Sequence, residues 1–116
     1  MERFFTTREQ DGHTVIEFET DALMNPLELE QVGQALYKVV DAGASHRYRL
    51  EFGKVQYLSS QAIGVILTLN KKLSAFKDHA LVLTGVGPQV LQMLKITRLD
   101  KLLTIQPAGE EKPKVR

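Results

Sequence analysis

Two adjacent serines stand where a short extended segment passes directly into an apolar helical segment. The chain reads FGKVQYLSSQAIGVILTLNKKL from Phe52 to Leu73, so Ser59 and Ser60 fall at the expected start of a helix with no long loop before it. A helix N-terminus carries unpaired N–H groups and a partial positive charge. A hydroxyl placed there can cap the helix, or it can accept a phosphoryl group that the helix end stabilises. The spacing alone leaves both interpretations open, and capping is the commoner use of serine.

The other reactive side chains show no catalytic or metal-binding pattern. His13, His46 and His79 lie apart beside expected turns or strand starts, and no two have the i, i+4 spacing of a metal site, so we place all three on the solvated surface. The serines lack the G-x-S-x-G sequence of hydrolases. The GVGP sequence at 85–88 lacks the further glycine and the lysine of a phosphate-binding loop, so it predicts a turn. We therefore expect a protein that is not an enzyme and that uses no cofactor or metal.

Composition restricts the class of protein further. A chain of 116 residues forms one domain, and 43% hydrophobic residues suffice for a core. The net charge is +1 and no basic cluster exceeds Lys71-Lys72, which argues against binding to nucleic acid. No apolar run is long enough to span a bilayer and no secretory signal is readable, so we expect no direct membrane insertion and a cytoplasmic location. The absence of cysteine excludes disulfides and agrees with that location.

Apolar patterning predicts a small α/β domain. Alternating or continuous apolar runs predict short strands at 4–5, 14–18, 48–52, 55–58, 80–83 and 102–105. Helical periodicity predicts helices that begin after Asn25, at Ser60 and at Pro88, the second of them reaching Phe76. The run at 80–83 is continuously apolar, as in a strand covered on both faces. The order of elements predicts a mixed β-sheet of about five strands with helices packed against it.

Local signals fix where these elements begin and end. Asp11-Gly12 predicts the turn of a hairpin. Asn25 suits the N-cap of the first helix, Pro26 its first position, and Gly43 its C-terminal end. Near the C-terminus, the spacing of Thr97 and Asp100 resembles a capping pair for one more turn.

The segment YLSSQAIGVIL at 57–67 resembles the signature of STAS domains, the anti-sigma factor antagonists and their relatives in transporters. That signature reads apolar-Asp-Ser-Ser/Thr-Gly-Leu-Gly-Val-Leu-Leu. Aligned without gaps, Ser60 falls on the phosphoacceptor serine of the family, whereas Ser59 replaces the aspartate and Ala62 replaces the first glycine. The segment ITRLDKLLTI at 96–105 resembles the C-terminal motif of the family. Residues 1–106 are identified as the STAS domain and 107–116 as a disordered C-terminal tail.

The resemblance implies a regulatory function rather than an enzymatic one. It implies an anti-sigma factor antagonist of a bacterial partner-switching system, which binds a GHKL-type serine kinase that is also an anti-sigma factor. Phosphorylation at Ser60 would cancel that binding. The alternative is a STAS-like accessory subunit of a membrane transport complex that docks on an ATPase without phosphorylation. The oligomeric state stays open.

The resemblance also implies which residues contact the partner. The loop before the first helix and the 85–88 turn lie beside the acceptor helix in the family. The expected contact residues are Ser59, Ser60, Gln61, Ile63, Asp21 and Val86.

Overall fold

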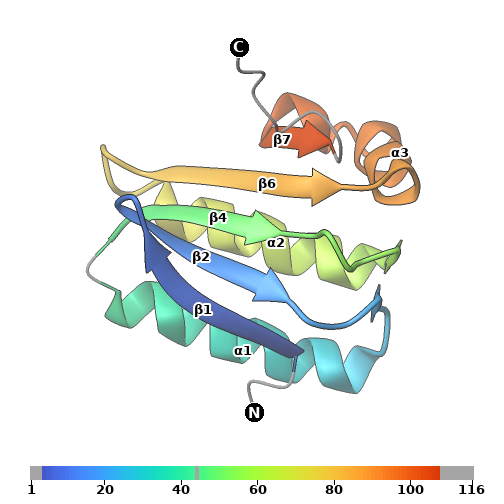
Figure 1. Cartoon of the computed structure of the whole chain (residues 1–116), viewed down its shortest axis with the longest axis horizontal. Helices are drawn as coiled ribbons and strands as arrows, with labels where there is room; N and C mark the ends of the chain where they lie inside the picture. Colours follow the sequence, from blue (N-terminus) through green and yellow to red (C-terminus); the bar gives the residue numbers. More distant parts are fainter. Residues whose placement is uncertain (1–3, 44, 108–116) are drawn as a thin grey trace.

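Five strands form one sheet in the spatial order β1-β2-β4-β6-β7 in the computed structural model, which describes residues 4–43 and 45–107 (Figure 1). Strands β1 and β2 form an antiparallel hairpin, and β2, β4, β6 and β7 are parallel neighbours. The strands of this sheet are β1 (Phe5–Gln10), β2 (His13–Phe18), β4 (Arg47–Glu51), β6 (Ala80–Val86) and β7 (Thr104–Pro107). The predicted mixed sheet of about five strands is confirmed.

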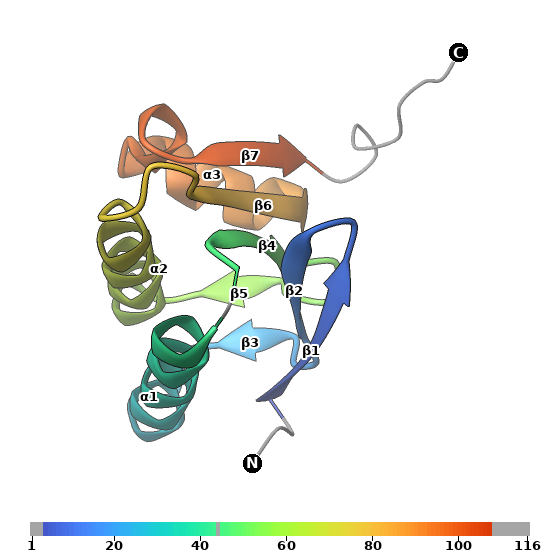
Figure 2. The same ribbon diagram turned by 90° about the vertical axis from the view of Figure 1, so that its left-hand side faces the viewer.

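Three helices connect the parallel strands. They are α1 (Pro26–Ala42), α2 (Ser60–Leu73) and α3 (Pro88–Ile96), and the short 3₁₀ turn η2 (Leu99–Lys101) follows α3. Each new parallel strand is added on the same side of the one before it. Right-handed crossovers in such an order bring successive helices to the same face of the sheet. Figure 2 shows α1 and α2 together in one layer beside the sheet.

Within residues 4–43 and 45–107 no helix covers the opposite face of the sheet, so that face is open and the prediction that 80–83 would be covered on both sides is wrong. Leu81 and Leu83 pack toward the helices and are buried, whereas Val82 between them faces the open side and is half-buried. Figure 1 looks onto this open face, with α1 and α2 behind the strands. The strand order, which the apolar run could not reveal, decides that one face stays uncovered.

The core lies between the sheet and the helices. The largest fully buried side chains are Tyr48, Phe52, Ile16, Leu50, Leu73, Leu83, Leu94, Val15, Val86 and Val90. They come from β2, β4, β6, α2 and α3 and from the segment after β4. All except Val15 belong to the core that joins the sheet to the helix layer, whereas Val15 lies on the open face as the register partner of Arg49. Among the described residues no helix is long and apolar enough to cross a bilayer.

The predicted hairpin turn and first helix start are confirmed. Asp11 and Gly12 both have positive φ (53° and 81°), as a type I′ hairpin turn requires. The Asn25 side chain accepts a hydrogen bond from the Glu28 N–H at 3.1 Å, and Pro26 is the first residue of α1.

Gly43 follows α1 as predicted but for a different reason. Its φ is −75°, so it does not adopt the left-handed conformation of a glycine C-cap. A Cβ at this position would lie 2.6 Å from the hydroxyl oxygen of Tyr48 and 2.9 Å from the Val39 carbonyl oxygen. Glycine is required here because the end of α1 lies against the buried tyrosine of β4.

Two short strands, β3 (Ala22–Leu23) and β5 (Tyr57–Leu58), form a separate parallel pair. The sequence indicated β5 but showed β3 only as a connector. Helix α2 ends at Leu73 rather than at the predicted Phe76, with Ser74 as its C-cap.

The C-terminal elements differ most from the prediction. Thr97 does not cap a following helix; its hydroxyl donates back to the Met93 and Leu94 carbonyls of α3 at 3.0 and 3.2 Å. The η2 turn then carries the chain past residue 102, so the last strand is β7 at Thr104–Pro107 rather than 102–105. Pro107, predicted to begin the tail, belongs to β7, and the rest of that predicted tail lies outside the described residues.

Candidate docking surface

The junction between β5 and α2 places the two serines in different roles. Ser59 has extended backbone angles and caps α2: its Oγ accepts the Ala62 N–H at 3.2 Å, and its carbonyl accepts the Ile63 N–H at 3.1 Å. A serine cap of this kind contributes about 1 kcal/mol to stability. The capping interpretation, left open by the spacing, therefore applies to Ser59.

Ser60 is the first residue of α2 and is exposed. Within the described part of the chain no hydrogen bond engages its hydroxyl, and the cap of the helix is made by the neighbouring serine. The first turn of α2 contains no acidic residue, so no side-chain carboxylate there offsets the positive end of the helix dipole. The Ser60 hydroxyl is therefore free, and a negative group attached to it would be stabilised by the helix end.

Backbone hydrogen bonds bring the loop that contains Asp21 beside this junction. The Asp21 carbonyl accepts the N–H groups of Gln56 and Tyr57 at 2.8 and 3.1 Å, and the Leu23 carbonyl accepts that of Ser59 at 3.1 Å. The β3–β5 pairing continues this contact. Asp21 is exposed and lies beside Gln56 and Tyr57 at the start of the β3–β5 pair, whereas Leu23 is the residue of this loop that contacts Ser59.

The N-termini of α1 and α2 lie side by side. The Gln61 side-chain amide donates to the Pro26 carbonyl at 3.3 Å, which links the first turns of the two helices. Three exposed apolar side chains come from the same elements: Leu27 in α1 is 78% exposed, and Met24 and Tyr57 are about half exposed. We call the group Asp21, Met24, Leu27, Tyr57, Ser60, Gln61 and Gly64 the serine surface. Exposed apolar groups around a free hydroxyl are suited to binding another protein.

Three of the predicted contact residues do not belong to this surface, and the first is Ser59, which is half-buried and uses its hydroxyl to cap α2. Ile63 is only 6% exposed and lies on the buried side of α2, and Val86 is 1% exposed at the end of β6. Their side chains fill the core and are not exposed on the serine surface. Sequence reasoning missed Met24, Leu27 and Tyr57; of these, Leu27 was detectable because it lies off the buried stripe of α1 formed by Leu29, Val32, Leu36 and Val40.

An ion pair holds the loops that carry the serine surface. The Lys54 ammonium in the β4–β5 loop binds the Glu19 carboxylate after β2. Its hydrogen bond to Glu19 holds the pKa of that carboxyl below the ordinary value and raises the pKa of Lys54. Both groups are exposed, so the pair orients the two loops more than it stabilises the fold.

The three histidines lie away from the serines and make local contacts. His79 is exposed, whereas His13 and His46 are half-buried. The ring of His46 stacks on Phe76 with 3.7 Å between centroids, and its Nδ1 lies 2.9 Å from the Asp78 carboxylate. The described residues contain no group of three or more His, Cys, Asp or Glu side chains that could hold a metal ion.

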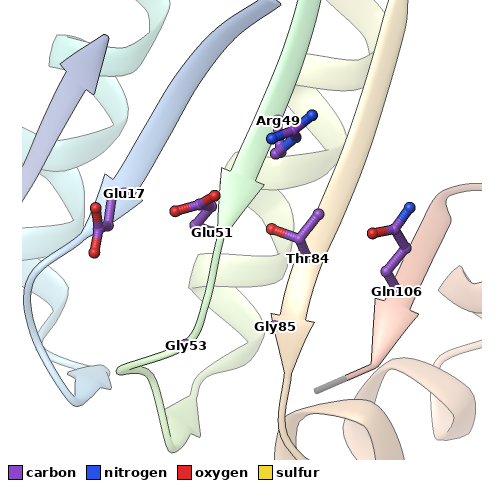
Figure 3. Close-up of a pocket in the computed structure, with 7 residues that line it drawn as sticks. All are labelled: Glu17, Arg49, Glu51, Gly53, Thr84, Gly85 and Gln106. Carbon is purple, nitrogen blue, oxygen red and sulfur yellow. The ribbon is translucent and has the colours of Figure 1, made fainter. Parts of the chain in front are cut away.

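A depression of about 460 Å³ lies on the open face of the sheet (Figure 3). Glu17 and Glu51 are register partners on β2 and β4, and Figure 3 shows the Glu51 carboxylate extending toward Glu17. Arg8 on β1 bridges them, at 3.2 Å from Glu17 and 3.4 Å from Glu51. Lys54 also lies 4.0 Å from Glu17, so two cations of the chain itself pair with the two carboxylates, and an ion-pair network borders the depression.

Comparison with known proteins agrees with the geometry. The family model described as Mlab, STAS domain, matches residues 5–104, so the chain belongs to the STAS domain family. A comparison with curated proteins finds no match to this chain.

Solved structures of STAS proteins share the fold. An anti-sigma-factor antagonist (STAS) domain protein from Planctomyces limnophilus has a TM-score of 0.81 at 17% identity, over 92% of both chains. The anti-sigma factor antagonist SpoIIAA in its unphosphorylated form has a TM-score of 0.73 at 18% identity, over 91% of this chain and 90% of the other. A sulfate transporter family protein from Wolinella succinogenes has a TM-score of 0.68 at 13% identity, over 89% of this chain and 84% of the other. The predicted STAS fold is confirmed.

Proposed function

We propose that this chain is a cytoplasmic, non-enzymatic anti-sigma factor antagonist of a bacterial partner-switching system. It binds a GHKL-type serine kinase that is also an anti-sigma factor, and phosphorylation of Ser60 ends that binding. The observation that supports this most directly is the exposed, unused hydroxyl of Ser60 at the start of α2, amid exposed apolar side chains. The structural neighbours described as anti-sigma factor antagonists support the same role.

Phosphorylation of Ser60 ends binding through the added charge rather than by unfolding the domain. A phosphoryl group on Ser60 adds about −1.5 to −2 charge at neutral pH. The α2 N-terminus stabilises this charge in the free protein. In the docked complex the same charge is removed from water without a partner, at a cost of several kcal/mol. Phosphorylation therefore weakens the complex and leaves the fold intact.

The departure from the family signature at Ser59 changes charge but not capping. Aspartate and serine are both good N-cap residues, and Ser59 makes the cap hydrogen bond to Ala62. Serine at this position leaves no carboxylate beside Ser60, so the phosphoryl group would be the first negative charge at the start of α2. The substitution therefore preserves the helix start and removes one negative charge beside Ser60.

Co-purification with a GHKL-type kinase whose gene neighbours the gene of this chain tests the docking surface. Ser60→Asp is expected to reduce binding by about a hundredfold or more, because it buries an unpaired carboxylate in the interface. Ser60→Ala is expected to bind normally. Gln92→Asp, at an exposed position of α3, is the charge-matched control. Normal binding by folded Ser60→Asp, or equal loss in Gln92→Asp, would refute the proposed surface.

Incubation with this kinase and ATP tests the modification. Intact-mass measurement is expected to show the gain of one phosphoryl group, mapped to Ser60 by peptide fragmentation and absent in Ser60→Ala. Ser59→Ala is expected to be phosphorylated normally but to be less stable by about 1 kcal/mol, because it loses the helix cap. Phosphate mapped to another residue would contradict the assignment of Ser60.

The second candidate function is an accessory subunit of a membrane transport complex that docks on its ATPase through the same surface. The structural neighbour described as a sulfate transporter family protein favours it, as does the absence of an acid at residue 59. In that case the purified ATPase binds the chain without any phosphorylation, and kinase with ATP leaves its mass unchanged. These two results together would replace the first proposal by the second.

A further inference from the structure

Helix α3 ends in a compact turn that stands apart from the serine surface. The turn is closed by backbone hydrogen bonds from the Arg98 N–H to the Lys95 carbonyl and from the Leu102 N–H to the Leu99 carbonyl, both at 3.0 Å. Leu99 and Leu103 are buried and anchor the turn to the core. We call residues 95–102 the α3 tip.

Two aliphatic side chains of the α3 tip face solvent to an unusual extent. Ile96, the last residue of α3, is 73% exposed, and Leu102 is 65% exposed. A single exposed aliphatic residue is ordinary on a protein surface. Two such side chains within one short turn form an apolar projection. Neither belongs to the core, because Leu99 and Leu103 are the side chains that this segment buries.

The α3 tip is also positively charged. Lys95, Arg98 and Lys101 are exposed, and none forms an ion pair with the residues that the structure describes. Asp100 is the one acidic residue in the 95–102 sequence, so the segment carries a formal charge of about +2 at neutral pH. This positive charge favours binding to an anionic partner.

Arg98 occupies a backbone conformation that glycine adopts more easily. Its φ is 63° and ψ is 21°, in the left-handed region that follows many helices. A non-glycine residue there is strained, because its Cβ crowds the following carbonyl oxygen. The chain thus places a cation at a site where its own stability favours glycine, which is consistent with a use for the side chain outside the fold.

We propose that the α3 tip is a peripheral docking site for the surface of an anionic lipid bilayer. Cations beside projecting aliphatic side chains match the anionic headgroups and the underlying apolar boundary of such a surface. A protein partner is less well suited, because stable protein interfaces use 20–30 residues a side and the tip offers eight. A bilayer needs no complementary shape. The contact is superficial and reversible, and none of the helices in the described part of the chain spans the bilayer.

The site is independent of the proposed function because it uses other elements. The serine surface belongs to the β3–β5 pair and the first turns of α1 and α2, whereas the tip lies at the end of α3, beside the edge strand β7 (Figure 1). Loss of kinase binding therefore leaves membrane docking unchanged, and loss of docking leaves kinase binding unchanged.

A single tryptophan can report docking because the chain has none. Ile96→Trp places the indole on the tip, and the matched control Leu27→Trp places it on the serine surface, where the native side chain is equally exposed. With vesicles of phosphatidylcholine and phosphatidylglycerol, the fluorescence of Ile96→Trp is expected to shift to shorter wavelength, and that of Leu27→Trp is not. Vesicles of phosphatidylcholine alone are expected to give no shift in either variant.

Charge removal tests the electrostatic part in the Ile96→Trp background. Each cation near an anionic surface strengthens binding about fivefold, so Lys95→Gln, Arg98→Gly and Lys101→Gln together are expected to weaken it about a hundredfold. Arg98→Gly also relieves the backbone strain, which keeps the triple variant folded. Lys38→Gln, at an exposed position of α1, is the single-charge control and is expected to bind normally.

Three results would overturn the proposal. They are no spectral shift of Ile96→Trp with anionic vesicles, unchanged binding by the folded triple variant, and equal binding to neutral vesicles. Addition of polyglutamate separates the lipid surface from an acidic protein. A shift with polyglutamate but not with vesicles would assign the tip to an acidic polypeptide instead.

Discussion

The exposed glycine at position 64 allows a direct test of the structure through the free energy of unfolding. It lies in the interior of α2, one turn after Ser60, and is exposed. A Cβ added there would meet no heavy atom within 4 Å. Glycine inside a helix is about 0.5–1 kcal/mol less favourable than alanine, because it loses more conformational freedom on folding. Gly64→Ala is therefore expected to stabilise the protein by about 0.5–1 kcal/mol.

Gly33, in the middle of α1, is the matched control. It is buried where α1 and α2 pack together, and its Cβ would lie 3.3 Å from Cγ2 of Val65 and 3.6 Å from the ring of Tyr37. Gly33→Ala gains the same helix propensity but forces the Val65 side chain to shift by a few tenths of an ångström. Its net effect is expected to be smaller than that of Gly64→Ala, or destabilising, because overpacking costs about 1–3 kcal/mol.

Urea and thermal unfolding measure both variants. For a domain of 116 residues, the gain at Gly64 corresponds to a rise in Tm of about 2–4 °C, with the urea m value unchanged. A lower Tm for Gly64→Ala, or a larger gain for Gly33→Ala, would show that the surroundings of the two glycines are not those described above.

The same variant bears on docking. The exposed glycine leaves room for the backbone of a partner close to α2, and alanine occupies part of that room. Gly64→Ala is therefore expected to weaken binding of the proposed kinase while it stabilises the free protein. Unchanged affinity, measured by titration calorimetry, would exclude Gly64 from the contact surface.

Three further predictions concern the cap, the core and a surface pair. Asn25→Ala removes the cap of α1 and is expected to cost about 1 kcal/mol in urea unfolding; no loss would contradict the cap hydrogen bond to the helix. Leu83→Ala, at a fully buried position in β6, is expected to cost about 2–5 kcal/mol, and a cost under 1 kcal/mol would contradict its place in the core. The hydrogen bond from His46 holds the pKa of the Asp78 carboxyl below its ordinary value, so this stabilising contribution is present above that ordinary value and is lost as the pH falls through the lower pKa of the folded state. His46→Phe is expected to return the Asp78 pKa toward the ordinary value in a carboxyl NMR titration, and an unchanged pKa would contradict the pairing.

Much of the fold could be predicted because its signals are local. The turn at Asp11-Gly12, the cap at Asn25 and the start of α2 at Ser60 each depend on a few adjacent residues, and the structure has them as predicted. The error at the C-terminus has the opposite cause. A leucine pair at 102–103 looks like a strand, but Leu99 and Leu103 instead enter the core from a tight turn and leave Leu102 outside.

The candidate site could be predicted only in part. The sequence by itself determined that a serine pair begins an apolar helix, because capping and helical periodicity act within a few residues of the chain. Only the tertiary structure decided that Ser59 is used as the cap, that the loop containing Asp21 lies along β5, and that Ile63 and Val86 are buried. These outcomes depend on the register of β3 against β5 and on the side of the sheet that the helices cover. Register and handedness are set by contacts between residues far apart in the chain, and no local pattern records them.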